Sequence, residues 1–386
     1  MDTALVYTPA LDSYDFGPGH PLRPERVSLA VHLLSDYGLT STRDHSATSG
    51  LRPLPVTPAD AESLLRVHDP AYVEAVMRAS VDPGIPVGHG IGPGDTPAFA
   101  GMHEAAALIA GASWAGMRSL LAGEAQRVLA PAGGLHHAHR DRAAGFCVYN
   151  DAAVAIASAL ARDPHLRIAY IDIDAHHGDG VQEAFYAEPR VLTVSLHQDG
   201  RYLYPGTGSY RERGVGSGTG TTLNVPLPPY ATPECYLLAL DGVVAPAVRA
   251  YSPDILVTQN GADAHWSDPL TALGMTIPGY ELLFTRLVSL AEEATGGRML
   301  ALGGGGYSWR TIVPRVWALL GASLLGETLP ARLPQTWRER VRGYGAEAPD
   351  ALRDDPPPPL DADTQALVLH DTAAVVDRLR MDLGLA

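Results

Sequence analysis

The segment YIDIDAHHGDG, residues 170–180, places several ionisable side chains directly after an apolar run. They are Asp172, Asp174, His176, His177 and Asp179. Because burying unpaired charge is strongly unfavourable, a strand that enters a core with this ending needs compensating partners. Side chains alternate along an extended strand, which predicts that Asp172, Asp174 and His176 point the same way. Asp174 and His176 are therefore suited to bind one cation.

A third ligand for this cation is expected from a neighbouring strand end. Asp263, in VTQNGADAHW, follows the apolar run at 254–259, and Gly261 before it permits a tight turn. Zinc accepts imidazole nitrogen and carboxylate oxygen, and catalytic zinc usually has three protein ligands. An Asp-x-His pair alone would serve equally well in capping or hydrogen bonding, but the third aspartate favours a metal site. Iron(II) or cobalt could take the place of zinc.

Two adjacent imidazoles, His136 and His137, follow a Gly-Gly pair in the segment PAGGLHHAHRDRAAGFCVYND, residues 131–151. A lone histidine is more often a satisfied core residue. Two in tandem beside a metal site indicate acid–base groups, since histidine titrates near neutrality. Each imidazole needs an acceptor at Nδ1, and Asp172 and Asp179 remain for this role once the metal ligands are assigned.

A glycine-rich turn is expected in LALGGGGYSW, residues 300–309, after another apolar run. Glycine lets backbone pass close to another group. Tyr307 then lies at the rim of the site with a hydroxyl to donate. A packed aromatic after a flexible turn is the alternative interpretation.

The elements that must hold these residues are short apolar strands that alternate with Ala- and Leu-rich helices. Strands are predicted at 127–130, 167–173, 191–196, 254–259 and 298–303. Helices are predicted at 101–122, 150–162, 233–250, 278–295, 309–325 and 363–383. Strands that are apolar on both faces indicate an α/β protein, with a central parallel sheet and helices on both faces. Sites in such sheets form beyond the carboxyl ends of the strands, where each polar segment falls.

Two regions are predicted along the chain. A catalytic domain is expected at 1–330, and a C-terminal appendage at 331–386 contains the Pro-rich linker DDPPPPL and the last helix. The Gly-rich segment 206–220 is expected to be a loop, because it matches neither a dinucleotide-binding nor a P-loop pattern.

Composition narrows the function classes. The 386 residues include 28 basic and 43 acidic ones, and the net charge of −15 argues against a nucleic-acid partner. The sequence contains no lysine, which excludes Schiff-base, pyridoxal-phosphate and P-loop lysines. With two cysteines, no signal peptide and no apolar stretch of membrane-spanning length, we expect a cytoplasmic protein without a membrane partner.

Together these segments resemble the zinc-dependent histone deacetylase family, in particular its bacterial acetoin-utilisation-type members. Over residues 14–310 the matching segments, in family order, are FGPGHPLRPERV, GDTPAF, GGLHHAHRDRAAGFCVYND, YIDIDAHHGDGVQEAFY, VLTVSLHQ, YPGTG, NGADAHWSDPL and LGGGGY. The resemblance implies an arginase/deacetylase-type α/β fold. It also implies hydrolysis of an acyl-lysine amide in a peptide or protein by activated water, with no covalent intermediate.

The resemblance also implies roles for single residues. Those similar to zinc ligands are Asp174, His176 and Asp263. Tyr307 is similar to the tyrosine that polarises the carbonyl. His136 paired with Asp172 resembles the inner imidazole dyad, and His137 paired with Asp179 resembles the outer one. The residues whose backbone resembles a potassium site are Asp172, Asp174, His176, Ser195 and Leu196.

Substrate contacts are implied in the same way. Phe146 and Tyr204 resemble the two aromatic walls of an acyl-lysine channel. Asp95 resembles the rim carboxylate that binds the substrate backbone, and Gly145 and Leu270 are also expected to contact the substrate. Tyr204 departs from many eukaryotic relatives, which carry Phe at that position.

The stretch after the third ligand, AHWSDPL, also departs by carrying the bulky His265 and Trp266, to which no contact is assigned.

A deacetylase of acetylpolyamines or other small acetylated amines is the first alternative function. An arginase-like two-metal enzyme is disfavoured because only one complete ligand set is found. A non-catalytic acyl-binding protein is disfavoured by the intact set of ligands, imidazoles and Tyr307.

Overall fold

The computed structural model describes residues 2–40, 50–92, 94–354, 357 and 359–385. One eight-stranded sheet lies at its centre in the order β2-β1-β3-β8-β7-β4-β5-β6, and every neighbouring pair is parallel. The strands are β1 (Thr3–Val6), β2 (Arg52–Leu54), β3 (Arg127–Ala130), β4 (Ile168–Asp172), β5 (Val191–Gln198), β6 (Thr222–Leu227), β7 (Ile255–Gln259) and β8 (Met299–Leu302). The predicted parallel sheet is therefore confirmed.

The five predicted strands are found as β3, β4, β5, β7 and β8. Every residue in these five strands is buried, which explains why they appear in the sequence as continuous apolar runs. The prediction lacked β1, β2 and β6. β2 contains only three residues, and β6 contains Pro226, which an edge strand tolerates. β1 is as short and as buried as β3 and β8, so its apolar run was available and was not used.

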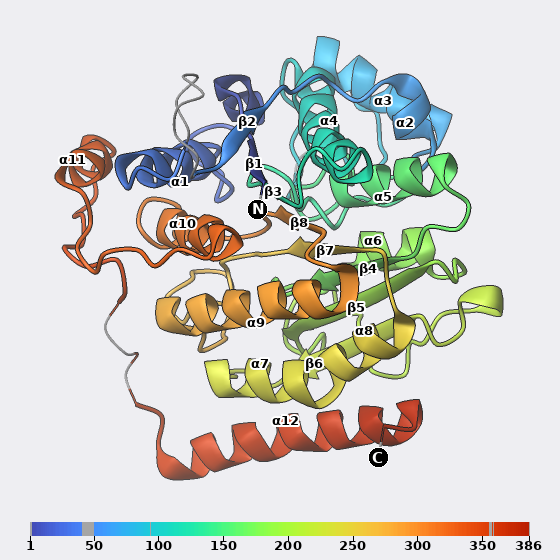
Figure 1. Cartoon of the computed structure of the whole chain (residues 1–386). Helices are drawn as coiled ribbons and strands as arrows, with labels where there is room; N and C mark the ends of the chain where they lie inside the picture. The colour runs from blue at the N-terminus through green and yellow to red at the C-terminus, as the bar shows by residue number, and fades with distance from the viewer. Residues whose placement is uncertain (1, 41–49, 93, 355–356, 358, 386) are drawn as a thin grey trace.

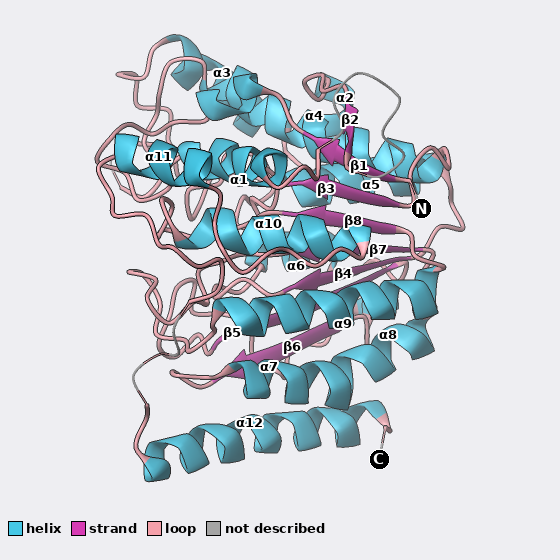
Figure 2. Ribbon diagram, turned by 60° about the vertical axis from the view of Figure 1, so that its left-hand side comes forward, coloured by secondary structure: helices cyan, strands magenta, loops and turns pink. Residues whose placement is uncertain are grey.

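Helices cover both faces of the sheet, as Figure 2 shows. One face carries α2 (Ala61–Leu65), α3 (Pro70–Val81), α4 (Met102–Leu121), α5 (Asp151–Arg162) and α6 (Asp179–Phe185). The other carries α1 (Glu25–Asp36), α7 (Pro233–Ala239), α8 (Ala245–Tyr251), α9 (Ile277–Thr295) and α10 (Ile312–Leu325). Two short 3₁₀ turns lie at Pro9–Ser13 and Gly216–Gly218.

The helix predicted at 233–250 is interrupted. A π-helical turn at Leu240–Val244 separates α7 from α8. Pro246 follows that turn, and because proline has no N–H it removes one α-helical hydrogen bond from the preceding turn. The Gly-rich segment 206–220 is a loop except for its 3₁₀ turn, as expected.

The C-terminal region wraps around the body of the protein. α11 (Gln335–Gly343) packs on α1, and the indole Nε1 of the buried Trp337 donates to the carbonyl of Leu29 at 3.0 Å. In Figure 1 the chain then passes down one side of the molecule to α12 (Ala362–Leu383), which packs against α7 and β6. The last helix is thus confirmed, whereas the domain boundary at 330 stays a prediction.

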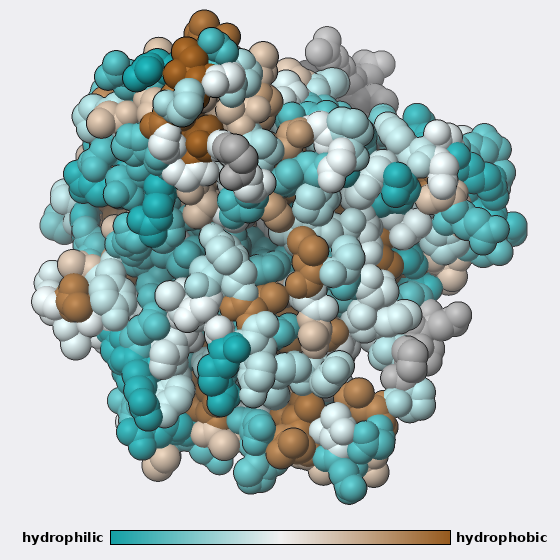
Figure 3. Space-filling view, turned by 180° about the vertical axis from the view of Figure 1, so that it is seen from behind, coloured by the Kyte–Doolittle hydropathy of each residue, from teal (hydrophilic) through white to brown (hydrophobic). Residues whose placement is uncertain are grey.

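The surface of one face is mostly polar. Seen from behind in Figure 3, it is largely hydrophilic, with hydrophobic side chains gathered in several small groups. Among the described helices, none combines the length and hydropathy that a membrane span requires.

The register of the strands brings the predicted site together. Asp172 at the end of β4 lies opposite Ser195 of β5 and Gln259 of β7, and Gln259 lies opposite Leu302 of β8. The segments that follow β3, β4, β7 and β8 therefore leave the sheet side by side, near its centre. The polar segments that follow these four strands therefore meet beyond the carboxyl ends of the strands.

Candidate active site

Three predicted metal ligands converge beyond the ends of β4 and β7. The Nδ1 atom of His176 lies 3.1 Å from Asp174 Oδ1 and 3.1 Å from Asp263 Oδ2. Within the described part of the chain, these three residues form the one group whose ligand atoms lie within 4.8 Å of one another. All three are buried. β4 ends at Asp172, so the predicted strand alternation does not continue to Asp174 and His176, which lie in the turn after it.

The charges of this cluster suit a divalent cation. Two buried carboxylates face one imidazole nitrogen, and burial together with the charge of Asp174 raises the pKa of Asp263 to about 7. A cation between the three groups would remove this repulsion. One imidazole nitrogen and two carboxylate oxygens are ligands that zinc accepts, and iron(II) or cobalt accepts them also. The residues present therefore fit a catalytic metal.

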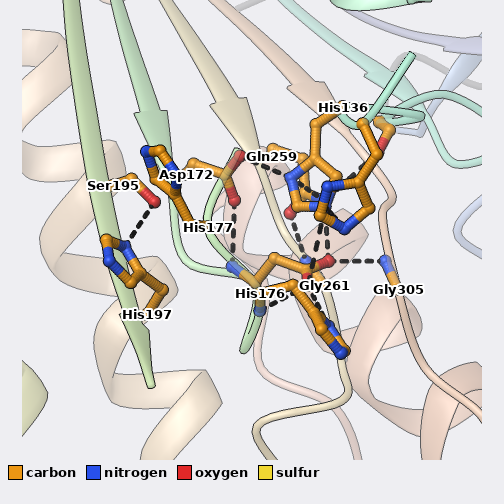
Figure 4. A network of polar contacts seen from close by, with 12 residues as sticks. His136, Asp172, His176, His177, Ser195, His197, Gln259, Gly261 and Gly305 are labelled. Carbon is orange, nitrogen blue, oxygen red and sulfur yellow. Dashed lines mark hydrogen bonds and ion pairs between the residues drawn. The ribbon is translucent and has the colours of Figure 1, made fainter. Parts of the chain in front are cut away.

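Neighbouring groups hold the carboxylate of Asp174 in place, and Gln259, Gly261 and Gly305 around it are labelled in Figure 4. The side-chain amide of Gln259 and the backbone N–H of Gly305 each donate to Asp174 Oδ2 at 2.7 Å. Gly261 was expected to permit a tight turn, but its φ is not in the left-handed region. It is needed for space, because a Cβ there would lie 2.2 Å from Asp174 Oδ2.

Two histidine–aspartate pairs stand beside the cluster. His136 Nδ1 donates to Asp172 Oδ2 at 2.8 Å, and His137 Nδ1 donates to Asp179 Oδ1 at 2.7 Å. The two Nε2 atoms are 3.0 Å apart. Both expected pairings are thus present, and the two imidazoles also contact each other through their Nε2 atoms.

The two imidazoles differ in proton affinity. Burial opposes a charge on His136, but Asp172 and Asp174 outweigh it and raise the pKa of His136 to about 9. Burial and the charge of His136 lower the pKa of His137 to about 4. Of the two imidazoles, His137 is therefore the one whose neutral form is favoured, as a proton acceptor requires.

Tyr307 lies at the rim of this group. Its ring centroid is 6.4 Å from that of His176 and 5.7 Å from that of Phe146. Burial raises the pKa of the Tyr307 phenol well above its ordinary value, so the hydroxyl keeps its proton and can donate it in a hydrogen bond. Asp268 Oδ2 accepts the Tyr307 backbone N–H at 2.9 Å and so fixes this segment.

The predicted substrate contacts lie in loops close to His137 and Tyr307. Tyr204 is 45% exposed, and its ring centroid is 5.1 Å from that of His137. Phe146, adjacent to Gly145, has a left-handed φ of 68°. The exposed Asp95 accepts the Gly145 backbone N–H through Oδ2 at 2.9 Å.

Leu270 is 39% exposed, and its N–H donates to Asp268 Oδ1 at 3.0 Å. It therefore belongs to the same loop as the residue that holds Tyr307. Its contact with substrate stays a prediction.

The residues of the predicted potassium site are all buried, with Asp172 at the end of β4, Asp174 and His176 in the turn after it, and Ser195 and Leu196 within β5. The Ser195 hydroxyl lies 2.8 Å from Nδ1 of His197, a neighbour that the sequence prediction did not include. The ring of His197 packs against that of His177 at a tilt of 48°, with 4.8 Å between centroids, and burial lowers the pKa of both. A potassium ion at this place stays a prediction.

Sequence reasoning missed several residues that support the site. Gln259 and Asp268 orient Asp174 and Tyr307, as described above. His139 contacts Asp179 Oδ2 at 3.3 Å from the side opposite His137. Asp268 and His139 lie within segments quoted for the resemblance, and Gln259 is the last residue of β7, directly before one of them. Position at or just after a strand end was therefore the available signal.

A fourth supporting residue, Arg26, lies far away in the sequence. This buried guanidinium donates to the carbonyl of Gly306 at 3.2 Å and lies over the ring of Trp317, 5.1 Å from its centroid. It fixes the turn that precedes Tyr307.

Comparisons with known proteins agree with this geometry. Residues 20–324 match the family model described as the histone deacetylase domain. The acetoin utilization protein AcuC of Bacillus subtilis is 40% identical over 342 residues, which cover 87% of this chain and 85% of that protein. AcuC of Staphylococcus aureus strain MRSA252 is 36% identical over 352 residues, which cover 89% of this chain and 87% of that protein.

Two solved structures are also similar. A histone deacetylase homologue from Aquifex aeolicus superposes with a TM-score of 0.82 at 29% sequence identity. A histone deacetylase homologue in complex with SAHA gives 0.82 at 30% identity. Each match covers 96% of this chain and 100% of the other.

Proposed function

The chain belongs to the histone deacetylase family and has its arginase/deacetylase-type fold, and from this premise we propose that it hydrolyses acyl-lysine amides in peptides or proteins. The acyl group is acetyl or a related chain, and the cofactor is a divalent metal ion, with zinc as the first choice. One observation carries the proposal. The Asp174–His176–Asp263 cluster, two histidine–aspartate pairs and Tyr307 meet at one edge of the sheet.

Asp174, His176 and Asp263 would hold the metal ion. When bound, the ion supplies Lewis acidity, which polarises an acyl carbonyl and lowers the pKa of a water molecule. The N–H of Gly305 and the amide of Gln259 keep Asp174 oriented toward that position. The cluster is buried, so its electrostatic effect on a substrate is stronger than it would be in water.

The imidazoles move the protons of the reaction. His137 Nε2 accepts a proton as the oxygen of water forms a bond with the acyl carbon, while Asp179 stabilises the resulting imidazolium. The Tyr307 hydroxyl donates a hydrogen bond to the carbonyl oxygen as it gains negative charge. The C–N bond then breaks, the imidazolium gives its proton to the leaving lysine amine, and the acid is the second product.

The proposed substrate is an acyl-lysine within a peptide, because the exposed Asp95 near the site offers an acceptor for peptide N–H groups. Phe146 and Tyr204 are placed to contact an apolar lysine stem, while the exposed Asp95 can accept from substrate backbone. The reaction is placed in the cytoplasm. The two cysteines, Cys147 and Cys235, are buried and unpaired, which supports a reducing compartment.

The test compares wild type, Asp95→Asn and the control Asp141→Asn, all loaded with zinc. kcat/KM is measured on an acetyl-lysine peptide, a longer acyl peptide and an acetylpolyamine. Asp95→Asn keeps an oxygen that can accept the Gly145 N–H but loses the negative charge. We therefore expect kcat/KM to fall about tenfold on the peptide and less than about threefold on the acetylpolyamine. Asp141 is an exposed carboxylate in the nearby 131–151 segment, so Asp141→Asn should change kcat/KM little on either substrate.

Equal losses on both substrates would mean that Asp95 only supports the loop at Gly145. A wild type that prefers the acetylpolyamine would make small acetylated amines the substrate class. Absence of turnover on all three substrates, with metal bound, would overturn the proposed hydrolase.

A further inference from the structure

Asp354, in the segment between α11 and α12, contacts the loop that carries the metal ligand Asp263. Its Oδ2 atom accepts from His265 Nε2 at 2.6 Å and from the indole Nε1 of Trp266 at 3.3 Å. Its Oδ1 atom accepts the backbone N–H of Ile277, at the start of α9, at 3.1 Å. One carboxylate thus binds both ends of the loop at 264–276.

The two bulky residues that follow the metal ligand therefore have a shared partner. His265 is 1% exposed, and its other nitrogen, Nδ1, accepts the Ser267 N–H at 3.2 Å. The imidazole is thus a donor at Nε2 and an acceptor at Nδ1, and only an acceptor such as the Asp354 carboxylate can satisfy Nε2.

This contact continues to the catalytic groups through the loop itself. The N–H of Asp268 donates to the carbonyl of His265 at 2.8 Å, and Asp268 Oδ2 accepts the Tyr307 N–H at 2.9 Å. Two residues before His265 stands Asp263, whose backbone carbonyl accepts the Thr271 hydroxyl. A displacement of His265 would therefore reach both a metal ligand and Tyr307.

The body of the protein holds Asp354 in place. The preceding Leu352 is fully buried, its N–H donates to Ala331 at 2.7 Å, and its carbonyl accepts from Arg315 of α10 at 3.1 Å. Arg353 forms an ion pair with Glu281 of α9, to which its Nε and Nη2 atoms both donate. The Asp354 side chain is accordingly only 11% exposed.

We propose that Asp354 is a positioning residue of the active site, which fixes the loop at 264–276 so that Asp263 and Tyr307 take their working places. The catalytic unit then extends at least to residue 354, beyond the end of the family match at 324. The effect on turnover rests on the proposed function, whereas the effect on metal affinity does not.

The first measurement is zinc affinity, obtained by competition with a chromogenic chelator, for wild type, Asp354→Ala, Asp354→Asn and the control Asp350→Ala. Asp350 lies in the same segment and pairs with Arg338, but it makes no contact with the loop. Asp354→Ala should weaken zinc binding about tenfold, the lower end of the effect of an orienting partner. Asp350→Ala should leave it unchanged.

The second measurement separates positioning from general stability. On the acetyl-lysine peptide, Asp354→Ala should lower kcat about tenfold with KM within about threefold. In a Tyr307→Phe background the same change should lower kcat less than about threefold, because part of its effect passes through Tyr307. Asp354→Asn keeps an oxygen that can accept the Ile277 N–H. If Asp354→Ala does not fold, Asp354→Asn takes its place, and a smaller decrease in kcat is expected.

Zinc affinity equal to wild type in both Asp354 variants would overturn the proposal. So would a kcat loss that is the same with and without the Tyr307 hydroxyl, since that result indicates a structural role alone. If wild type turns over none of the substrates, the proposed function fails, and the zinc affinities still decide whether Asp354 positions the loop.

Discussion

Gly305 offers a test of the metal site that depends on space alone. It follows β8, and its φ is not in the left-handed region, so alanine is compatible with its backbone. A Cβ at this position would lie 2.0 Å from Asp263 Oδ2 and 2.8 Å from Asp174 Oδ2. Gly305→Ala therefore pushes on both carboxylates of the cluster without changing any polar group.

The size of the effect follows from these distances. Ordinary van der Waals contact begins at 3.4 Å, so Asp263 Oδ2 must move by about 1.4 Å, or the turn must move away by a similar amount. Metal ligands tolerate deviations of only about 0.2 Å. Either movement also strains the Gly305 N–H bond to Asp174. Because a ligand itself is displaced, we expect zinc affinity to fall by at least about 100-fold, the upper end for orienting partners.

The assay is competition for zinc with a chromogenic chelator, together with metal content after dialysis. Gly343→Ala is the matched control, because a Cβ there meets nothing within 4 Å and the backbone φ is ordinary. Circular dichroism and thermal unfolding without metal establish that both variants fold. If Gly305→Ala binds zinc within about threefold of wild type, the carboxylates do not hold the metal in this arrangement.

Three further outcomes are expected. Tyr307→Phe should lower kcat about 10²-fold while metal content stays at the wild-type level, and a loss below about threefold would make Tyr307 a packing residue. Asp263→Ala should lose metal and activity together with the fold retained, and full metal occupancy would contradict its assignment as a ligand. Burial opposes a charge on His139, but Asp179 and Glu183 outweigh it and raise its pKa to about 9. Its stabilisation is thus complete below the ordinary pKa of about 6.5 and is lost as pH rises through 9. The thermal midpoint of His139→Asn should accordingly fall less between pH 6 and 10 than that of wild type, and parallel curves would refute this.

The strands that hold the site were predictable from the sequence because strands buried on both faces are continuous apolar runs. The short helices could not be predicted in this way. α2, α6 and α11 have five to nine residues, and helices of this length are stabilised by packing rather than by their own propensity. α1 and α3 are longer and each buries one side, so a usable signal for them was present and was not applied.

Within the candidate site, the residues that directly follow a strand could be predicted from the sequence. The metal cluster and the two imidazole pairs lie where parallel strands end, and chain order alone places them there. Asp354 is separated from His265 by 89 positions, and no local pattern connects them. Such partners depend on which surface segments cross, which follows from the packing of helices and not from periodicity.

The sheet order explains why so distant a residue reaches the site. β8 lies between β3 and β7, so the helices that follow β7 and β8 cover the centre of the same face. The segment after α11 crosses these helices, bonding to Arg315 of α10 and Glu281 of α9 before it reaches the start of α9. The loop after β7 ends at that same point, in Thr276. A residue placed there can bind the loop from outside, so the last strand does not mark the end of the structure on which Asp263 and Tyr307 depend.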